Sequence, residues 1–248
     1  MRRFAWVIVA VLAVFALAFG ADAALRSYAE KRMETEIQQA LPSGVTTPGL
    51  NVTVRGFSFF AQYLAGDFSQ VDVDAPAITT ERGSVSASLE AYGVRIDRSF
   101  TKAPVLGTVH GTLRVSESAV NSLIALPDPT AAVRLSSRTV TYDATTQVLG
   151  LPLSYSAAVR PVADGKVVKL FPKSVDVTSG PVHFDVKQLL GGVFDGEPID
   201  ICIAPYLPEG LNVGDISIIR RSASIGFDAT DFSLDPKTFD AHGSCPKS

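Results

Sequence analysis

The residues that could perform acid–base or metal chemistry are few and widely separated. The three histidines, His110, His183 and His242, show no H-E-x-x-H pattern or comparable ligand spacing. The sequence also lacks the G-x-S-x-G, P-loop and G-x-G-x-x-G motifs that mark hydrolases, NTPases and dinucleotide enzymes. We therefore predict no catalytic residue, metal site or cofactor, and we interpret the histidines as structural or surface residues.

Two short patterns resemble parts of active sites but fit other roles better. Ser99 and Lys102 form an S-x-x-K pattern, yet the S-D-N and K-T-G elements that accompany it in penicillin-binding enzymes are missing. Asp72 and Asp74 could hold a divalent metal, but in a strand they also form the polar face opposite Val73. We favour the polar-face interpretation.

The N-terminus carries a signal for export. Arg2 and Arg3 precede an apolar run, Phe4 to Ala21, that contains no charged residue. A run of about 18 residues is longer than a signal-peptide core and lies at the lower limit of a membrane-spanning helix. Ala21-Asp22-Ala23 also has the small-x-small spacing that signal peptidase accepts. Residues 1–23 are thus predicted to be either a cleaved signal peptide or an N-terminal membrane anchor, and both remain open.

The rest of the chain, residues 24–248, is predicted to be one exported domain in the periplasm or cell envelope. Its length is sufficient for a single large core. The net charge of −3 and the pI near 5.6, with scattered Lys and Arg, leave no basic surface for nucleic acid.

Both cysteines of the chain lie in this exported part. Cys202 and Cys245 are predicted to form a disulfide, because thiols are commonly oxidised outside the cytosol. In the chain-entropy description, such a bridge stabilises the fold by about 4 kcal/mol.

A long amphipathic helix is predicted directly after the export segment, followed mostly by strands. The helix is indicated by apolar residues at steps of three and four, and Pro42 to Gly44 ends it. We expect its apolar stripe to pack on the core, with a separate membrane-surface helix as the alternative. The stripe consists of Leu25, Tyr28, Ala29, Met33, Ile37, Ala40 and Leu41.

The alternation of apolar and polar residues predicts strands with one apolar face. It is clearest at 71–74, 85–91, 109–115, 153–159 and 225–229. The alternation changes phase at Tyr92-Gly93, which indicates a bulge or bend in a long curved strand. Asp164-Gly165 predicts a hairpin.

Short helices are predicted between these strands, at 57–64, after Ser116, and at 186–194. The resulting fold class is α+β, with a long antiparallel sheet and no alternating parallel units.

Three segments resemble the LmeA-like phospholipid-binding family of actinobacterial cell-envelope proteins. The first, Val54 to Ala75, reads VRGFSFFAQYLAGDFSQVDVDA, and its Gly56, Phe59-Phe60 pair and Gly66 match the family pattern. The others are GTLRVSESAVN, from Gly111 to Asn121, and LPEGLNVG, from Leu207 to Gly214.

The resemblance implies a curved antiparallel sheet wrapped around a long N-terminal helix with short inserted helices, similar to tubular lipid-binding domains. It also implies a periplasmic protein that binds a phospholipid, with a role in assembling envelope glycolipids such as lipomannan. From the resemblance and the apolar helical segments we predict lipid contacts at Tyr28, Met33, Ile37, Phe57, Phe59, Phe60, Tyr63, Leu64, Leu123, Ile124, Leu189, Leu190 and Phe194.

The function favoured by the sequence is therefore non-enzymatic phospholipid binding or transfer at a membrane surface. Two alternatives remain open at this point. One is an envelope scaffold or adaptor with a filled core, and the other is an enzyme of glycan or lipid assembly whose site carries no known motif.

Overall fold

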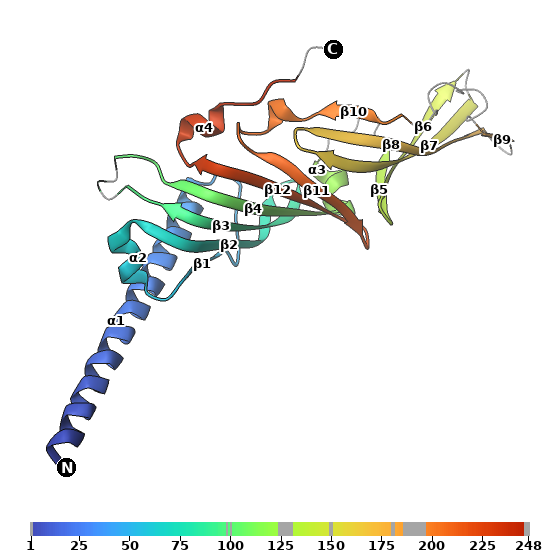
Figure 1. Cartoon of the computed structure of the whole chain (residues 1–248). Helices are drawn as coiled ribbons and strands as arrows, with labels where there is room; N and C mark the ends of the chain where they lie inside the picture. The colour runs from blue at the N-terminus through green and yellow to red at the C-terminus, as the bar shows by residue number, and fades with distance from the viewer. Residues whose placement is uncertain are drawn as a thin grey trace.

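The computed structural model describes residues 2–97, 99, 101–123, 131–148, 151–179, 182–185 and 197–245 (Figure 1). A long N-terminal helix is followed by two antiparallel sheets with short helices between their strands. Both sheets are open rather than closed on themselves. This arrangement confirms the predicted α+β class and the long N-terminal helix.

The first sheet has six strands in the order β1-β2-β3-β4-β12-β11. Its strands are β1 (Asn51–Arg55), β2 (Asp67–Thr80), β3 (Gly83–Arg95), β4 (Val105–Ser116), β11 (Asn212–Ile219) and β12 (Ser222–Ser233). The second sheet has the order β10-β8-β7-β6-β5, and β9 also pairs with β8. Its strands are β5 (Ala132–Ser136), β6 (Thr139–Val148), β7 (Leu151–Asp164), β8 (Val167–Ser179), β9 (Val182–Asp185) and β10 (Ile199–Cys202).

The helices are α1 (Arg2–Ala40), α2 (Phe59–Ala65), α3 (Glu117–Leu123) and α4 (Pro236–Asp240), with a 3₁₀ turn, η2 (Ala204–Tyr206). Helix α1 runs without interruption through the predicted export segment and the predicted amphipathic helix. Within the part of the chain whose side chains are described, no helix is both long and apolar enough to cross a membrane. The segment 186–194, predicted as a helix, lies outside the described residues.

The sheet bends where the sequence alternation changes phase. Ala91 and Val94 of β3 are both buried, three positions apart, and so are Leu106 and Val109 of β4. Gly93 adopts φ 59°, a conformation that glycine reaches without steric cost. The predicted bend at Tyr92-Gly93 is therefore confirmed.

Gly107 continues the bend in the neighbouring strand, opposite Gly93. A Cβ atom at Gly107 would lie 3.0 Å from the carbonyl oxygen of Tyr92 and 3.1 Å from that of Gly93. The backbones of β3 and β4 can approach this closely only because position 107 carries no side chain.

Helix α1 covers the outer edge of the first sheet. Glu34 Oε1 accepts a hydrogen bond from the N–H of Val52 at 3.1 Å, and Glu30 Oε1 accepts one from the N–H of Val54 at 2.8 Å. Four helical residues rise about 6 Å and two strand residues about 6.6 Å, so the two glutamates match the spacing of the two N–H groups. The edge strand β1 is thereby satisfied by side chains.

This edge position corrects the predicted packing of the helix. Ala29 and Met33 pack against the core, but Leu25 and Tyr28 of the predicted stripe are exposed. The side of α1 that faces the domain includes Glu30 and Glu34, because a strand edge needs acceptors for its N–H groups as well as apolar contacts.

Helix α3 covers the edge of the second sheet in the same way. Glu117 Oε2 accepts from the N–H of Leu135 at 2.8 Å. The amide of Asn121 both accepts from the N–H of Val133 and donates to its carbonyl, at 2.7 Å each. As predicted, the hydroxyl of Ser116 caps this helix by accepting from the N–H of Ala119 at 3.1 Å.

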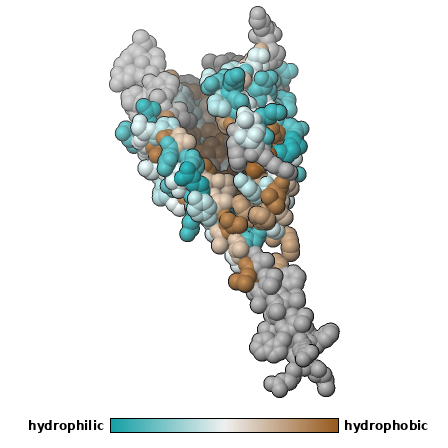
Figure 2. Space-filling view, turned by 90° about the vertical axis from the view of Figure 1, so that its left-hand side faces the viewer, coloured by the Kyte–Doolittle hydropathy of each residue, from teal (hydrophilic) through white to brown (hydrophobic). Residues whose placement is uncertain are grey.

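The apolar sides of the two sheets meet to form one continuous surface, which we call the inner face. The junction is a cluster in which Val133 and Leu135 of β5 pack with Ile218 of β11. Figure 2, a view from the α1 end, shows a hollow with apolar residues inside and hydrophilic residues on its outer walls. By register, the inner face comprises Val71, Val73, Ala87, Leu89, Ala91, Val109, Leu113, Ile218, Ile225, Phe227, Ala229, Val133, Leu135, Val140, Tyr142, Tyr155, Ala157 and Val159.

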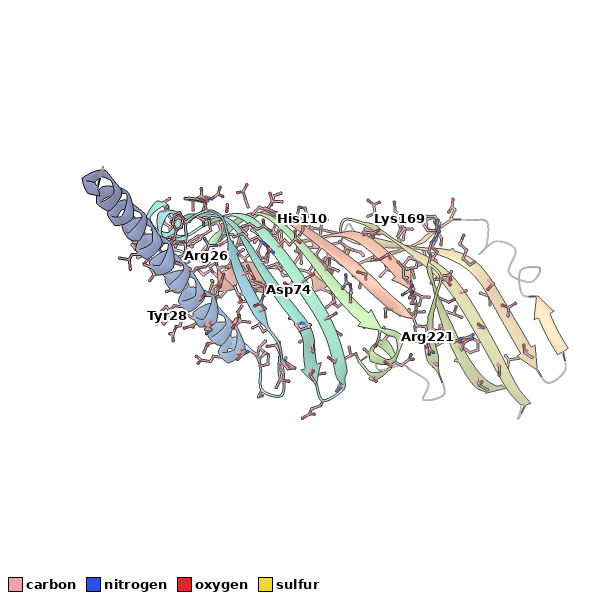
Figure 3. All side chains as sticks on the ribbon, turned by 90° about the horizontal axis from the view of Figure 1, so that it is seen from below. Arg26, Tyr28, Asp74, His110, Lys169 and Arg221 are labelled. Atoms are coloured by element: carbon pink, nitrogen blue, oxygen red, sulfur yellow. A yellow bond between two sulfur atoms is a disulfide. The ribbon has the colours of Figure 1, made fainter. Side chains whose placement is uncertain are left out.

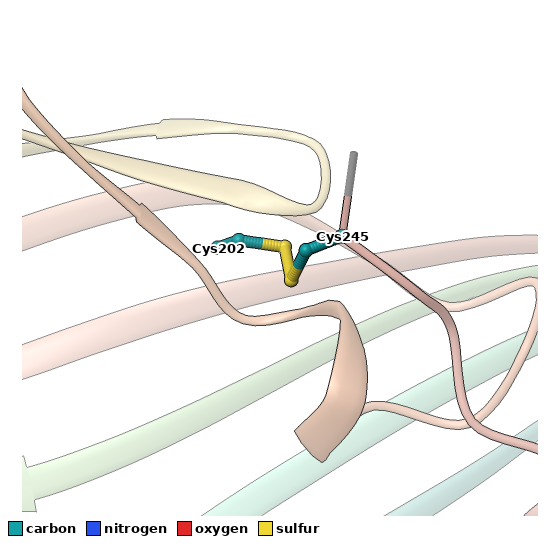
Figure 4. Close-up of a disulfide and its surroundings, with 2 residues drawn as sticks. All are labelled: Cys202 and Cys245. Atoms are coloured by element: carbon teal, nitrogen blue, oxygen red, sulfur yellow. A yellow bond between two sulfur atoms is a disulfide. The ribbon is translucent and has the colours of Figure 1, made fainter. Parts of the chain in front are cut away.

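The C-terminal tail is tied to the second sheet. Cys202, at the end of β10, is bonded to Cys245, as predicted (Figure 4). The N–H of Glu209 donates to the carbonyl of Ala241 at 2.7 Å, and Pro208 forms a bridge with His242. A disulfide is typical of proteins that mature in an oxidising, exported environment. The predicted hairpin at Asp164-Gly165, which joins β7 and β8, is also confirmed.

Candidate lipid-binding surface

The inner face is covered near α1 and partly open to solvent farther along. Ala91, Val109 and Ala229 are buried in the core cluster that includes Phe59 of α2. Leu113 and Phe227 farther along the first sheet, and Tyr142 and Ala157 of the second sheet, are only half-buried. The junction residues between them, such as Ile218, are buried. Soluble proteins seldom expose an apolar surface that spans two sheets unless it binds something.

The dimensions of this surface suit an acyl chain. Six strands at about 4.8 Å spacing give the first sheet a width of about 24 Å. Half of the hydrocarbon core of a bilayer, which is the depth of one lipid leaflet, is about 15 Å. An extended acyl chain can therefore lie on the inner face without reaching past its edges.

Helix α2 closes the α1 end of the inner face. Ser58 begins it with a side-chain cap to the N–H of Ala61 at 3.1 Å, and Gly66 ends it at φ 75°. Phe59 points into the core, where its ring centroid lies 5.7 Å from that of Phe68. Tyr63 stacks on Phe59 at 6.3 Å. The predicted short helix at 57–64 is thus confirmed, with its start shifted to Phe59.

The remaining predicted aromatic and aliphatic contacts of this segment point outward. Phe57 is 86 % exposed, Phe60 52 % and Leu64 54 %, and Tyr63 is also exposed. Only Phe59 is buried among the five residues predicted from 57–64. The segment therefore presents two surfaces: one side packs under the inner face, and the other is an apolar patch open to solvent.

The other predicted lipid contacts are spread over the fold. Met33 packs against the first core cluster and Ile37 is half-buried, whereas Tyr28 is exposed on the side of α1 away from the sheet (Figure 3). Leu123 is half-buried at the end of α3, beside Gly83 of β3. The predictions outside the described residues are Ile124, Leu189, Leu190 and Phe194.

Asp22 joins α1 to α2 through a shared cap. Its carboxylate accepts from the N–H of Phe60 at 2.9 Å, the N–H of Phe59 at 3.0 Å and the hydroxyl of Ser58 at 2.8 Å. These bonds, led by the one from Phe60, lower the pKa of Asp22 below its ordinary value. Arg26 donates to the carbonyl of Gly56 at 2.9 Å and lies 3.6 Å from the Asp22 carboxylate.

The outer side of the sheets is polar. Asp72 is buried beneath Arg55, to which it is paired, and it accepts from the amide of Gln70 at 2.7 Å. The Asp72 carboxylate raises the pKa of Arg55 above its ordinary value. Asp74 is exposed two positions along the same strand. Among the described residues, no group of three His, Cys, Asp or Glu side chains is placed to hold a metal.

Neither of the remaining chemical patterns forms an enclosed site. His110 Nδ1 lies 2.6 Å from Asp228 Oδ1 on the exposed outer side. The Ser99 hydroxyl donates to Asp97 at 2.6 Å, and the backbone N–H of Lys102 donates to the same carboxylate at 3.2 Å. The hydrogen bonds from the hydroxyls of Ser99 and Thr101, led by that from Ser99, hold the pKa of Asp97 well below its usual range. Ser99 and Lys102 thus serve as hydrogen-bond donors to Asp97.

The roles of three side chains that hold α1 against the domain could not be predicted from the sequence. Asp22 appeared to belong to the export segment, while Glu30 and Glu34 appeared to be ordinary surface residues of an amphipathic helix. The spacing of Glu30 and Glu34 by four residues is a signal for one helical face, but it does not identify the strand edge they serve.

Comparison with known proteins identifies one relationship. No curated protein and no solved structure is found to match the chain. A family model described as LmeA-like phospholipid-binding matches residues 20–221. That match begins within α1, includes α2 and reaches the turn between β11 and β12. The chain therefore belongs to the LmeA-like phospholipid-binding family.

Proposed function

We propose that the protein binds a phospholipid with its acyl chains on the inner face. The observation that carries this proposal is the continuous, partly exposed apolar surface shared by the two sheets. Membership in a phospholipid-binding family supports it independently. The lipid headgroup remains near the polar rim, where water and the hydrophilic outer walls are accessible (Figure 2).

Burial of alkyl groups supplies the affinity. Each methylene removed from water contributes about 0.8 kcal/mol, so two long chains outweigh the cost of ordering them. This mode of binding needs apolar area rather than a particular charge. Binding is therefore proposed to occur without a catalytic step.

The outer hollows of the structure are poorly suited to acyl chains. One lies between Asp74, Ser86 and Arg114, and the other between Asp143 and Asp176 on the second sheet. Both are open to solvent, and most of the residues that line them are polar. An alkyl chain there would remain in contact with water and would desolvate charged side chains.

The proposed location is the cell envelope. Residues 1–23 direct export, as a cleaved signal or as an anchor, and residues 24–248 form the lipid-binding domain next to a membrane surface. A supply of lipid for envelope glycolipid assembly, such as that of mannan or lipomannan, is a finer role proposed on the family resemblance alone.

The direct test is mass spectrometry of lipids retained by the full chain after extraction in mild detergent and exchange into detergent-free discs of defined lipid. Retention of a lipid absent from the disc mixture, at a fixed ratio to protein, is the expected result. A protein that carries no foreign lipid and takes up no fluorescent phospholipid from vesicles contradicts the proposal.

A pair of adjacent substitutions tests the location of the site. Ala157 lies on the inner face of β7, and Ser156 lies on its outer side, paired with Asp143 and Asp176. Ala157→Trp fills part of the inner face and is expected to lower the lipid content strongly. Ser156→Trp adds the same volume on the other side and should leave the lipid content unchanged.

Two outcomes would favour the other functions. Equal lipid content in both variants at equal thermal stability would remove the inner face as the site and favour a scaffold with a filled core. Turnover of a lipid-linked glycan that disappears in Asp72→Asn would instead indicate an enzyme.

A further inference from the structure

The outward side of the α1–α2 corner carries an apolar cluster that nothing in the described structure covers. We call it the α2 patch, and it consists of Phe19, Phe57, Phe60, Tyr63 and Leu64. Each of these side chains is at least 44 % exposed. Helix α2 itself, FFAQYLA, contains no charged residue.

The patch is held in a fixed shape by hydrogen bonds. Asp22 caps α2, and Arg26 holds the carbonyl of Gly56, immediately before Phe57. The ring of Phe57 meets that of Phe19 edge to face, with centroids 6.0 Å apart. The aromatic side chains are thus presented on a hydrogen-bonded frame.

The charges at this corner are turned inward and neutralise each other. The side chains of Asp22 and Arg26 are 14 % and 26 % exposed and lie 3.6 Å apart. A partner that covers the patch therefore meets apolar groups and no unpaired charge from this frame. A hydrocarbon environment fits such a surface without desolvating an ion.

We propose that the α2 patch lies against a lipid bilayer and orients the inner face toward it. This inference rests on the proposed function and deepens it by naming the contact surface. A bilayer is the partner indicated by the chain that adjoins the patch. Phe19 belongs to the uncharged run Phe4 to Ala21, and α1 continues through this run away from both sheets (Figure 1). Phe59 lies on the core side of α2, so the helix that touches the membrane also closes the inner face.

Because Asp22 and Arg26 neutralise each other, the contact should not depend on the charge of the lipid headgroup. Contact arises from burial of apolar side chains, so it should be similar on phosphatidylcholine and phosphatidylglycerol vesicles and insensitive to salt. A surface that works by cationic residues would require the anionic lipid and weaken as salt screens the charges.

The test uses the full chain in phosphatidylcholine vesicles with an environment-sensitive dye on one introduced cysteine. Leu64→Cys places the dye on the patch, and Tyr206→Cys, at a site 81 % exposed in η2, is the matched control. We expect bromine-labelled lipids to quench the dye at position 64 and not at position 206. A dye at position 64 that remains as water-exposed as the one at position 206 overturns the proposal.

A second measurement separates a bilayer from a protein partner. Shielding of position 64 without lipid, increasing with protein concentration, would mean that a second copy covers the patch and would also overturn the proposal. Phe57→Ser combined with Leu64→Ser should slow lipid uptake from vesicles by about tenfold or more, because two large apolar contacts are lost. Tyr206→Ser combined with Ile219→Ser should not slow it.

Failure of this inference differs from failure of the proposed function. Lipid retention with an unquenched dye at position 64 refutes only the bilayer contact. A quenched dye in a protein that retains no lipid refutes only lipid binding on the inner face.

Discussion

Asp22 and Phe60, 38 positions apart in the chain, are joined by a hydrogen bond of 2.9 Å from the backbone N–H of Phe60 to the Asp22 carboxylate. The carboxylate lies on the N-terminal side of the cleavage position predicted after Ala23. Cleavage there would remove the cap from α2 together with the Phe19 ring that meets Phe57. The end of the predicted export segment is therefore in contact with the rest of the fold.

Removal of this cap should destabilise the protein at neutral pH. Asp22→Ala deletes the two carboxylate oxygens that accept these three hydrogen bonds and should lower the midpoint of thermal unfolding, while Asp22→Asn, which keeps one acceptor oxygen, should have a smaller effect. A chain that starts at Ala24 should resemble Asp22→Ala. Asp74→Ala, at an exposed position, is the control. An equal decrease in its unfolding midpoint would contradict the capping role of Asp22.

The stabilisation by the Asp22 carboxylate should depend on pH. The pKa of Asp22 is lower in the folded state than in the unfolded state, so the carboxylate stabilises the fold fully above the unfolded value, near 3.8. That stabilisation is lost as the pH falls through the folded-state pKa. The difference in unfolding midpoint between wild type and Asp22→Ala should therefore be constant from pH 7 to pH 5 and shrink below about pH 4. A difference that grows on acidification would show that the charge is not stabilising.

The disulfide should make a large contribution to stability. Cys202 and Cys245 are separated by 43 positions, and closing a loop of this length stabilises the fold by about 4 kcal/mol in the chain-entropy description. Urea unfolding of the Cys202→Ser, Cys245→Ser double variant measures the loss. Labelling of both thiols by an alkylating reagent in the native, unreduced protein would show that the bridge does not form.

The bend in the first sheet should depend on Gly107 more than on its neighbour Gly111 in the same strand. A methyl group at position 107 would meet two carbonyl oxygens at 3.0 and 3.1 Å, whereas at position 111 it would make ordinary contacts from 3.6 Å. We expect Gly107→Ala to cost about 1–3 kcal/mol of unfolding free energy, as overpacking commonly does. Equal stability of the two variants in urea would exclude a backbone contact at the bend.

Two glutamates of α1 allow a test of the hydrogen bonds that cover the edge of β1. Glu30→Ala removes the acceptor of the Val54 N–H, and Val54 is only 1 % exposed. An unsatisfied buried donor lowers the unfolding free energy by about 1–3 kcal/mol. Glu36→Ala removes an exposed partner of Arg32 and should change the unfolding free energy little. Similar losses in the two variants would contradict the edge role.

The sequence predicted features that depend on neighbouring residues. The strand alternation, the Asp164-Gly165 hairpin and the bend at Tyr92-Gly93 each arise from short-range backbone preferences. The disulfide could be predicted because the chain offers only one pair of cysteines. The division into two sheets could not, since β4 pairs with β12 about a hundred residues later and alternation carries no information about such distant partners.

The placement of the apolar residues around the candidate lipid-binding surface could be predicted only in part. Apolar residues such as Phe59 and Phe60 are neighbours in the sequence, yet one is buried and the other exposed because α2 lies across the end of the sheet. The roles of Asp22 and Glu30 depend on backbone donors 24 or more positions away. Such side chain to backbone contacts have no residue pattern of their own.

The two helix-covered edges also influence how these molecules can associate with each other. An open strand edge is a template for fibre growth, but the N–H groups of Val52 and Val54 in β1, and of Val133 and Leu135 in β5, are already occupied by helix side chains. Self-association through these N–H groups is therefore blocked. Besides the α2 patch, the inner face is then an apolar surface through which two copies could associate. Lipid and a second molecule would compete for it, so we expect the lipid cargo to act as a solubility factor: the loaded protein stays dispersed, and delivery of its lipid exposes it to aggregation until the next load.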